Sequence, residues 1–152
     1  MAEPLYTADE MRAAEERYPG FPESAGELRE RAGGFVAAQV RARYIAAHRV
    51  TVVCGAGSNG GDGRIAAEVL REEEFEVHVV DESGGWLGEP DVVVDALFGT
   101  GFHGEPRPDA VRLIESMNDA GVPFVAVDVP SGVNASTGEV AGIAVRADTT
   151  VT

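Results

Sequence analysis

The sequence contains no lysine and only one cysteine among its 152 residues, and all twelve basic residues are arginine. The absence of lysine excludes a Schiff-base mechanism. It also excludes the Walker-type phosphate loop, which needs a lysine beside the β- and γ-phosphates. Cys54 cannot form an intramolecular disulfide, which fits a reducing compartment, and we therefore expect a cytoplasmic protein.

Positive charge and long apolar segments are also scarce. The net charge of −14 at pH 7 predicts no binding to nucleic acid or to anionic lipid, because both require a basic face. No apolar run approaches the roughly 20 residues that span a bilayer, and the first sixteen residues are too acidic for a signal peptide. A content of 44% hydrophobic and 25% charged residues is typical of a globular protein, and the length predicts one domain.

Two amphipathic helices are predicted before residue 50. Thr7 with Glu10, and Ser24 with Glu27, have the spacing of capping boxes, so each pair should begin a helix. The first helix should end near Tyr18, because the Pro-Gly-Phe-Pro that follows cannot continue it. The second helix has an apolar stripe with arginines on its other face. The stripe consists of Leu28, Val36, Val40, Tyr44 and Ile45.

A glycine pair, Gly33-Gly34, lies in the middle of the second helix. It should either weaken the helix or allow close packing against a neighbour. The two amphipathic helices could also form the interface of a homodimer.

From residue 50 the sequence alternates short apolar strands with helices. Strands are predicted at 50–54, 76–80, 91–96 and 124–128, and helices at 61–74 and 109–120. This alternation is typical of a mainly parallel sheet with right-handed crossovers, and hence of a doubly wound α/β fold. Residues 81–90 are too few for a crossover helix. Residues 147–152 look like the start of another strand, so we expect either a fragment or a sheet that a further segment completes.

Three loops that follow predicted strands are rich in glycine or begin with aspartate. The turn at 55–63 follows the first strand, Asp95 leads into 97–105, and Asp128 leads into Pro130-Ser131-Gly132. Because the C-terminal ends of parallel strands share one edge of a sheet, these loops should converge where ligands bind in such folds. Glycines let the backbone approach a ligand and adopt positive φ, and free N–H groups at a helix start attract phosphate.

Each feature also has a purely structural interpretation. Asp62 could neutralise the positive end of its helix, and Asp95 and Asp128 could cap turns. In combination they favour a binding site, because an apolar strand that runs into an aspartate buries a charge, which is costly without a partner. We therefore predict one ligand site at this edge of the sheet.

The first loop also matches a dinucleotide fingerprint. Gly55, Gly57 and Gly60 have G-x-G-x-x-G spacing after a strand, and Asp81 ends the next strand at the distance expected of a ribose-binding acid. An NAD(P)-dependent oxidoreductase is therefore an alternative hypothesis. Two observations argue against this hypothesis: the sequence shows no separate substrate domain, and an oxidoreductase fingerprint does not explain the other two loops.

Three segments resemble the signature loops of the NAD(P)H-hydrate epimerase family, the YjeF amino-terminal domain. They are CGAGSNGGDG (54–63), VVDALFGTGFHGE (93–105) and VDVPSGVNASTGEV (127–140). In addition, ELRERAGG (27–34) is similar to the family's N-terminal helix motif, and AVRADTTVT (144–152) to the strand after the third loop. The resemblance covers nearly the whole chain and is far more specific than a lone glycine fingerprint.

The resemblance implies a Rossmann-like three-layer αβα sandwich, with residues 1–152 as one domain. It implies an enzyme that interconverts the R and S forms of hydrated NADH or NADPH, called NAD(P)HX. The implied partner is an NAD(P)HX dehydratase, either separate or fused after this domain. A potassium ion is implied on Asn59, Asp95 and Ser131, whose amide, carboxylate and hydroxyl oxygens suit a hard cation.

The resemblance also implies a set of substrate-binding residues, which includes Asp128. The others are Ser58, Asn59, Gly60, Gly61, Asp62, Gly99, Thr100, Gly101, Phe102, His103, Gly104 and Glu105. Epimerising a carbon that bears a hydroxyl beside a ring nitrogen requires proton transfer, by ring opening or by loss and return of water. We interpret Asp128 as the general acid or base. His103 is interpreted first as a loop-surface residue and second as a proton carrier.

The sequence departs from the family pattern at three places. Ser58 replaces the first of two asparagines, 81–90 nearly deletes a helix-containing segment, and the chain stops before the last strands of the usual domain. These departures keep another hypothesis open, namely a non-catalytic nucleotide-binding module or one half of a fused dehydratase.

Overall fold

The computed structural model describes residues 6–152, which contain four helices and one sheet of five strands. In chain order the elements are α1 (Ala8–Glu16), α2 (Ala25–Arg43), β1 (Arg49–Cys54), α3 (Ser58–Glu72), β2 (Glu76–Asp81), β3 (Val92–Ala96), α4 (Pro108–Asn118), β4 (Phe124–Val127) and β5 (Thr149–Val151). The predicted α/β fold is confirmed.

The sheet is parallel throughout, in the order β2-β1-β3-β4-β5. The chain moves outward from β1 to β2, then returns across β1 to β3 and continues the other way. The order therefore reverses between β1 and β3, which is the place where doubly wound sheets open a crevice for ligands.

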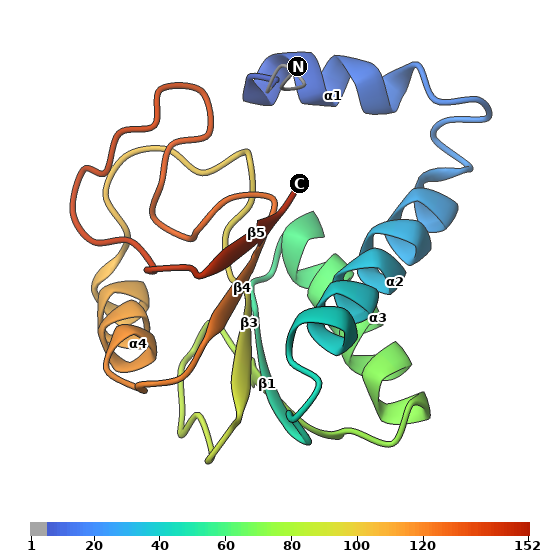
Figure 1. The fold of residues 1–152 in the computed structure, drawn as a ribbon. Helices are drawn as coiled ribbons and strands as arrows, with labels where there is room; N and C mark the ends of the chain where they lie inside the picture. Colours follow the sequence, from blue (N-terminus) through green and yellow to red (C-terminus); the bar gives the residue numbers. More distant parts are fainter. Residues whose placement is uncertain (1–5) are drawn as a thin grey trace.

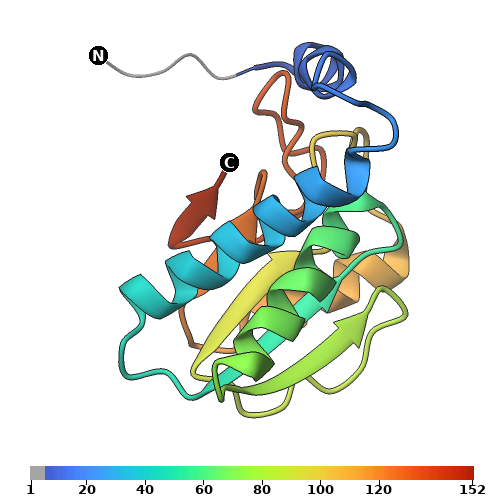
Figure 2. The same cartoon turned by 90° about the vertical axis from the view of Figure 1, so that its right-hand side faces the viewer.

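Helices cover both faces of the sheet, so the fold has three layers (Figure 1). On one face α2 packs on α3, and α3 on the strands (Figure 2). Side chains such as Val52, Val94 and Leu70 form the core there. On the other face α4 places Leu113, Ile114 and Met117 over the neighbouring strand positions, including Val53 and Val93. All five residues of β3 are buried, as expected of an unbroken apolar strand that is covered on both faces.

Most predicted boundaries hold within two residues, but α3 begins earlier than expected. Its first residue is Ser58, three positions before the predicted start, so the glycine-rich segment is largely the first turn of a helix. Strand β4 ends at Val127, which leaves Asp128 just outside it. Residues 82–91 contain no helix, as predicted.

The two expected capping boxes have different outcomes. Thr7 accepts from the backbone N–H of Glu10 and the Glu10 carboxylate accepts from the N–H of Thr7, so the first box is confirmed. The second is wrong. Ser24 has α-helical dihedral angles and its side chain makes no capping bond, while Glu27 instead accepts from the Tyr18 hydroxyl.

Gly33 explains how α2 and α3 approach each other. A Cβ atom at Gly33 would lie 2.6 Å from Cγ2 of Ile65, so the close-packing interpretation of the glycine pair is confirmed. The predicted stripe is wrong at Ile45, which is 85% exposed because α2 ends at Arg43.

Helix α1 lies apart from the other layers, beyond the edge where β1, β3 and β4 end (Figure 1). None of its residues is buried, and its backbone meets the body of the protein where the Ala8 N–H donates to Oγ of Ser136. No helix within residues 6–152 has the length and apolar character needed to cross a membrane.

Candidate active site

A cavity of about 710 Å³ lies at the C-terminal edge of the sheet, against the loops that follow β1 and β3. Its floor comes from the strand ends and loops: Ala56, Gly57, Ser58, Asn59, Asp62, Leu97, Phe98, Gly99, Thr100, Gly101, Phe102, Asp128 and Glu82. Its other wall comes from α1, α2 and the segment between them: Ala8, Met11, Arg12, Glu15, Phe21, Ala25, Leu28, Arg29 and Ala32. The predicted convergence of loops at one edge is confirmed.

Close backbone contacts explain the glycines of the first loop. A Cβ atom at Gly55 would lie 2.0 Å from the carbonyl oxygen of Leu97, and one at Gly60 would lie 1.9 Å from the carbonyl oxygen of Gly55. Neither glycine has positive φ, so the expectation of left-handed backbone in this loop is wrong. The glycines are required because the loops after β1 and β3 touch through their backbones.

Asn59 is the most unusual side chain of the site. It is only 5% exposed, yet neither its amide oxygen nor its amide nitrogen has a hydrogen-bond partner among the described residues. A buried amide without partners costs free energy, so such a group is expected to meet a ligand or ion. Asn59 lies in the first turn of α3 and lines the cavity.

Asp95 and Ser131 are fully buried, do not line the cavity, and hydrogen-bond to each other. One carboxylate oxygen of Asp95 accepts from the Ser131 N–H at 2.8 Å, and the other accepts from the Ser131 hydroxyl at 2.6 Å. The Ser131 hydroxyl in turn accepts from the Phe98 N–H at 2.9 Å. Ser131 thus supplies the partner that the buried aspartate needs, and the pair ties the loops after β3 and β4 together.

Asp128 has a left-handed backbone conformation, with φ 66°. This conformation is uncommon for a residue with a side chain, and such strain gathers at functional positions. A Cβ atom at Gly99 would lie 3.1 Å from Oδ2 of Asp128 and 3.0 Å from Cβ of Asn59, so the bare backbone of Gly99 separates these two side chains. Burial, and secondly the charge of Glu15, raise the pKa of Asp128.

Asp62 is the second desolvated carboxylate of the cavity. Burial, with a smaller contribution from the charge of Asp128, raises its pKa to about 6. Arg29 opposes this shift from α2, where its Nε lies 3.9 Å from Oδ1 of Asp62. Two desolvated carboxylates with raised pKa values thus lie in one cavity, an arrangement typical of groups that transfer protons.

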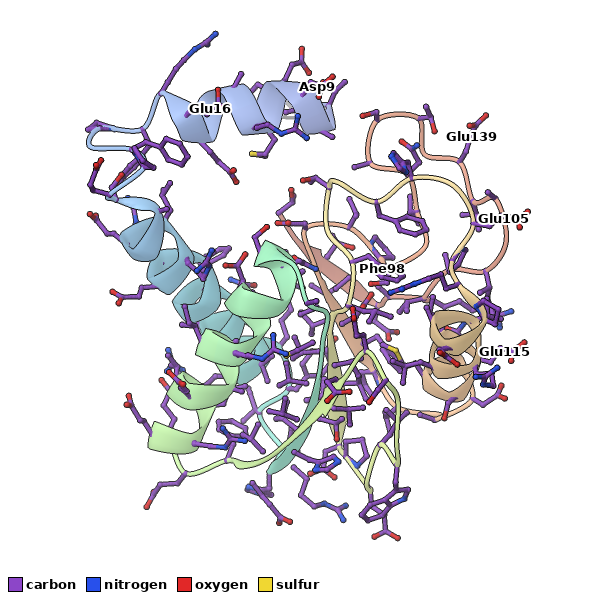
Figure 3. All side chains as sticks on the ribbon, turned by 180° about the vertical axis from the view of Figure 1, so that it is seen from behind. Asp9, Glu16, Phe98, Glu105, Glu115 and Glu139 are labelled. Atoms are coloured by element: carbon purple, nitrogen blue, oxygen red, sulfur yellow. The ribbon has the colours of Figure 1, made fainter. Side chains whose placement is uncertain are left out.

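The structure brings together only part of the predicted substrate set. Ser58, Asn59, Asp62, Asp128 and the segment 99–102 line the cavity. Gly60 and Gly61 form the helix turn behind it. His103, Gly104 and Glu105 are exposed and are not part of the wall, and Glu105 lies at the outer edge of the molecule, whereas Phe98 lies further inward (Figure 3).

Sequence reasoning missed the wall that α1 and α2 contribute. Arg12, Glu15 and Arg29 line the cavity. Of these three, Arg29 alone had a signal in the sequence, because it belongs to the ELRERAGG segment (27–34) that is similar to the family's N-terminal helix motif. Asp81, the ribose-binding candidate of the oxidoreductase hypothesis, is not part of the wall. Its carboxylate instead accepts from the N–H and hydroxyl of Ser83 and caps a turn.

The oxygen donors of Asn59, Asp95 and Ser131 are of the chemical type that suits a hard cation rather than a transition metal. Asp95 and Ser131 already hydrogen-bond to each other, so the free oxygen donor of the three is that of Asn59. Within the described part of the chain, no cluster of three His, Cys, Asp or Glu side chains could hold a metal ion. The unpartnered amide of Asn59 is the observation that favours a cation, since its oxygen is free to coordinate one.

The family model described as YjeF-related protein N-terminus matches residues 25–84 and 80–152. This chain belongs to that family. An NAD(P)H-hydrate epimerase of Limosilactobacillus fermentum is 34% identical to this chain over 181 aligned residues, which cover the whole chain and 86% of the relative. The NAD(P)H-hydrate epimerase of Legionella pneumophila strain Philadelphia 1 is 31% identical over 83% of the chain, which spans 59% of that relative.

Longer members of the YjeF family also match. A bifunctional NAD(P)H-hydrate repair enzyme of Pyrobaculum aerophilum is 37% identical over 97% of this chain, which spans only 35% of that relative. The crystal structure of the yeast protein ynu0 superposes with a TM-score of 0.84 over 97% of this chain and 79% of its own, at 21% identity, and it supports the fold.

The two matched pieces of the family model meet at residues 80–84, where β2 ends. This is the position at which the sequence nearly deletes a helix-containing segment of the YjeF pattern. The connection leaves Trp86 75% exposed. Of residues 81–90, only Glu82 lines the cavity, so the shortened segment lies mostly outside the cavity walls.

Proposed function

We propose that this protein epimerises the R and S forms of hydrated NADH and NADPH and so serves nicotinamide nucleotide repair. The observation that carries the proposal is the cavity itself, in which the strained, desolvated Asp128 faces the same space as Asp62 and the unpartnered Asn59. Relatives 31–34% identical that are named NAD(P)H-hydrate epimerase support the same reaction.

Substrate binding would use the first turn of α3 and the loop after β3. Ser58, Asn59 and Asp62, together with Gly99, Thr100, Gly101 and Phe102, line the cavity and support this assignment. Phe98 and Phe102 stack with ring centroids 4.7 Å apart and give this wall an apolar face for a flat ring. His103, Gly104 and Glu105 would contact only a part of the substrate that extends beyond the cavity.

Asp128 would act as general acid and general base. A protonated Asp128 carboxyl gives its proton to the substrate hydroxyl, the carbon–oxygen bond breaks, and water leaves. When water returns to the opposite face of the ring, the Asp128 carboxylate takes up one proton from it. One proton is given and one is recovered, so the protons balance. Ring opening and closure would need the same donation and uptake. Burial raises the pKa of Asp128, which favours the protonated form that this donation requires.

Asn59, Asp95 and Ser131 would hold a potassium ion through their oxygen atoms. The ion would supply positive charge beside the buried Asp95 and an electrostatic anchor for substrate oxygens. Asp95 and Ser131 already fix the relative positions of their two loops through their mutual hydrogen bonds.

The test follows both epimers of hydrated NADPH by chromatography, with and without protein, in potassium and in sodium. Spontaneous epimerisation sets the baseline, so the measured quantity is the acceleration. We expect acceleration that is greater in potassium. Asp128→Asn should lower it by about 10²- to 10⁴-fold, the usual contribution of a general acid or base, and should keep the fold because asparagine tolerates left-handed backbone.

Near-normal turnover of Asp128→Asn would contradict the catalytic assignment. No acceleration at any concentration of the unchanged protein would favour the non-catalytic module. Hydride transfer to an added substrate would favour the oxidoreductase, against which the turn-capping role of Asp81 already argues.

We also infer that this domain works in the cytoplasm with an NAD(P)HX dehydratase, separate or fused, and that residues 1–152 form one epimerase domain. The bifunctional repair enzymes among its relatives support the link. A homodimer through the N-terminal helices is supported by Phe35 of α2, which is 53% exposed. Light scattering after gel filtration would test the dimer.

A further inference from the structure

The charges around the cavity are poorly matched to an anionic dinucleotide. Of the described residues that line it, Glu15, Asp62, Glu82 and Asp128 are acidic, and only Arg12 and Arg29 are basic. The molecule as a whole carries −14. Phosphate groups entering this space therefore need a local cation to offset the repulsion.

Arg29 lies where such a cation is needed. Its side chain runs across the first turn of α3, where a Cβ atom at Gly61 would lie 3.0 Å from Nε and 3.1 Å from Cδ. The glycine thus leaves room for the guanidinium group to lie on the start of the helix.

The guanidinium of Arg29 is also not engaged elsewhere. Its Nε lies 3.9 Å from Asp62, too far for a hydrogen bond, and it has no other ionic partner among the described residues. The side chain is 44% exposed, so its terminal N–H groups can reach a ligand. A planar fork of free donors is the geometry that binds phosphate best.

Two further features of the same turn favour an anion. Gly57, the N-cap of α3, provides no side chain to satisfy the first backbone N–H groups. The buried side-chain nitrogen of Asn59, in that turn, also has no partner among the described residues and can donate to a phosphate oxygen, whereas it is the oxygen of the same amide that favours a cation. Arg12 is a weaker candidate, because its side chain is 64% exposed and it lies on α1, which buries no residue.

We propose that Arg29 binds a phosphate group of the dinucleotide against the first turn of α3 and thereby determines how the nucleotide is positioned in the cavity. This inference rests on the proposed function for the identity of the ligand. The phosphate belongs either to the diphosphate bridge or to the 2′-phosphate that distinguishes the NADPH form.

The experiment measures binding by calorimetry with ADP-ribose, its 2′-phosphorylated form and adenosine. For Arg29→Met we expect the Kd of a phosphate-bearing probe to rise about 10- to 100-fold, as for a lost hydrogen bond to a charged group. Arg29→Lys should recover part of the affinity. Arg43→Met is the matched control, because Arg43 lies at the far end of the same helix and, among residues 6–152, its side chain hydrogen-bonds only to Gln39.

The two phosphate probes identify the source. A loss of affinity for both assigns Arg29 to the diphosphate, and a loss only for the 2′-phosphorylated probe assigns it to the 2′-phosphate. Equal Kd values for Arg29→Met and the unchanged protein would overturn the proposal, and so would a lack of binding by the unchanged protein. If a phosphate probe binds in an Arg29-dependent way but the protein does not accelerate epimerisation, the proposed function is contradicted, while the contact between Arg29 and phosphate is still supported.

Discussion

At the scale of single residues, three aspartates show how the surroundings decide what a carboxylate does. Asp91 is exposed to solvent on one side and accepts from the N–H groups of His48 and Arg49, which keeps its pKa below the usual value. Asp95 is fully buried, and burial raises its pKa to about 6 despite the bonds from Ser131. Asp62 is desolvated with only a distant cation. Asp91 therefore stabilises the fold, whereas Asp62 is free to take part in proton transfer.

Asp62→Asn should stabilise the protein above pH 6. The folded-state pKa of about 6 exceeds the usual 3.8, so the folded protein disfavours the ionised form, a difference that corresponds to at most about 3 kcal/mol. This cost is fully present above pH 6, falls as the pH drops from 6 toward 4, and disappears below about pH 3, where the carboxyl is protonated in both states. Urea unfolding of both proteins across this pH range measures the gain.

The control for this substitution is Asp9→Asn, which removes a carboxylate whose side chain is 92% exposed. It should show no comparable pH-dependent gain. A stability difference between Asp62→Asn and the unchanged protein that stays constant from pH 7.5 to pH 4 would contradict the desolvation argument.

Gly99→Ala should impair turnover while Gly101→Ala should not. The new methyl group at 99 would press on Oδ2 of Asp128 and on Asn59, whereas at 101 no atom lies within 4 Å. Small displacements of catalytic groups can cost about 100-fold in rate, so we expect a loss of about 10- to 100-fold for Gly99→Ala. Epimerisation rates and melting temperatures of both variants check this. Equal rates would mean that the contact around Gly99 is not part of the machinery.

At the scale of elements, the packing of α2 on α3 depends on one member of the glycine pair. A Cβ atom at Gly33 would meet Cγ2 of Ile65 at 2.6 Å and the carbonyl oxygen of Asp62 at 2.8 Å, but one at Gly34 would meet nothing within 4 Å. The two adjacent glycines therefore differ in their surroundings, since Gly33 faces α3 and Gly34 does not. Since Asp62 belongs to the cavity wall, this contact also fixes the site.

Alanine at these two positions should have opposite effects on stability. Gly33→Ala should lower the free energy of unfolding by about 1–3 kcal/mol through overpacking. Gly34→Ala should raise it by about 0.5–1 kcal/mol, because alanine favours the helix more than glycine does. Denaturant unfolding followed by circular dichroism measures both. A stabilising Gly33→Ala would show that α2 can move away from α3 without cost.

The elements of the sheet were largely predictable from the sequence, and the cavity only in part. Valine-rich runs such as 92–94 identify buried strands, and Pro and Gly identify several helix ends. The early start of α3 was missed because three glycines in its first turns oppose helix formation locally, while tertiary contacts around Gly60 and Gly63 require them. The place of α1 could not be read, because it depends on contacts such as the one between Ala8 and Ser136.

At the scale of the whole molecule, the sheet is unevenly covered. β3 is buried on both faces between β1 and β4, whereas β2 is an edge strand with alternating exposure. The helix-free connection after β2 leaves Trp86 exposed, with His78 packed beside it. The β2 edge is thus less protected than the centre of the sheet.

Hydrogen exchange should reflect this difference. Amides of β3 should exchange slowest, through global unfolding, and amides of β2 should exchange faster through local opening. Exchange followed by NMR or mass spectrometry provides the rates. Equal protection of β2 and β3 would show that the two strands open together and that the exposed connection has no effect on local stability.

The cavity has a floor built by the ends of parallel strands and a roof built by the two helices that precede them. Asp62, Glu82, Asp128 and the unpartnered amide of Asn59 belong to the floor, whereas both arginines and Glu15 belong to the roof. Selection could therefore alter nucleotide preference by replacing side chains in the first 32 residues, without disturbing a single proton-transferring group. A chimera that takes α1 and α2 from a relative and keeps the strand-end loops of this protein would show whether nucleotide preference changes while the reaction stays the same.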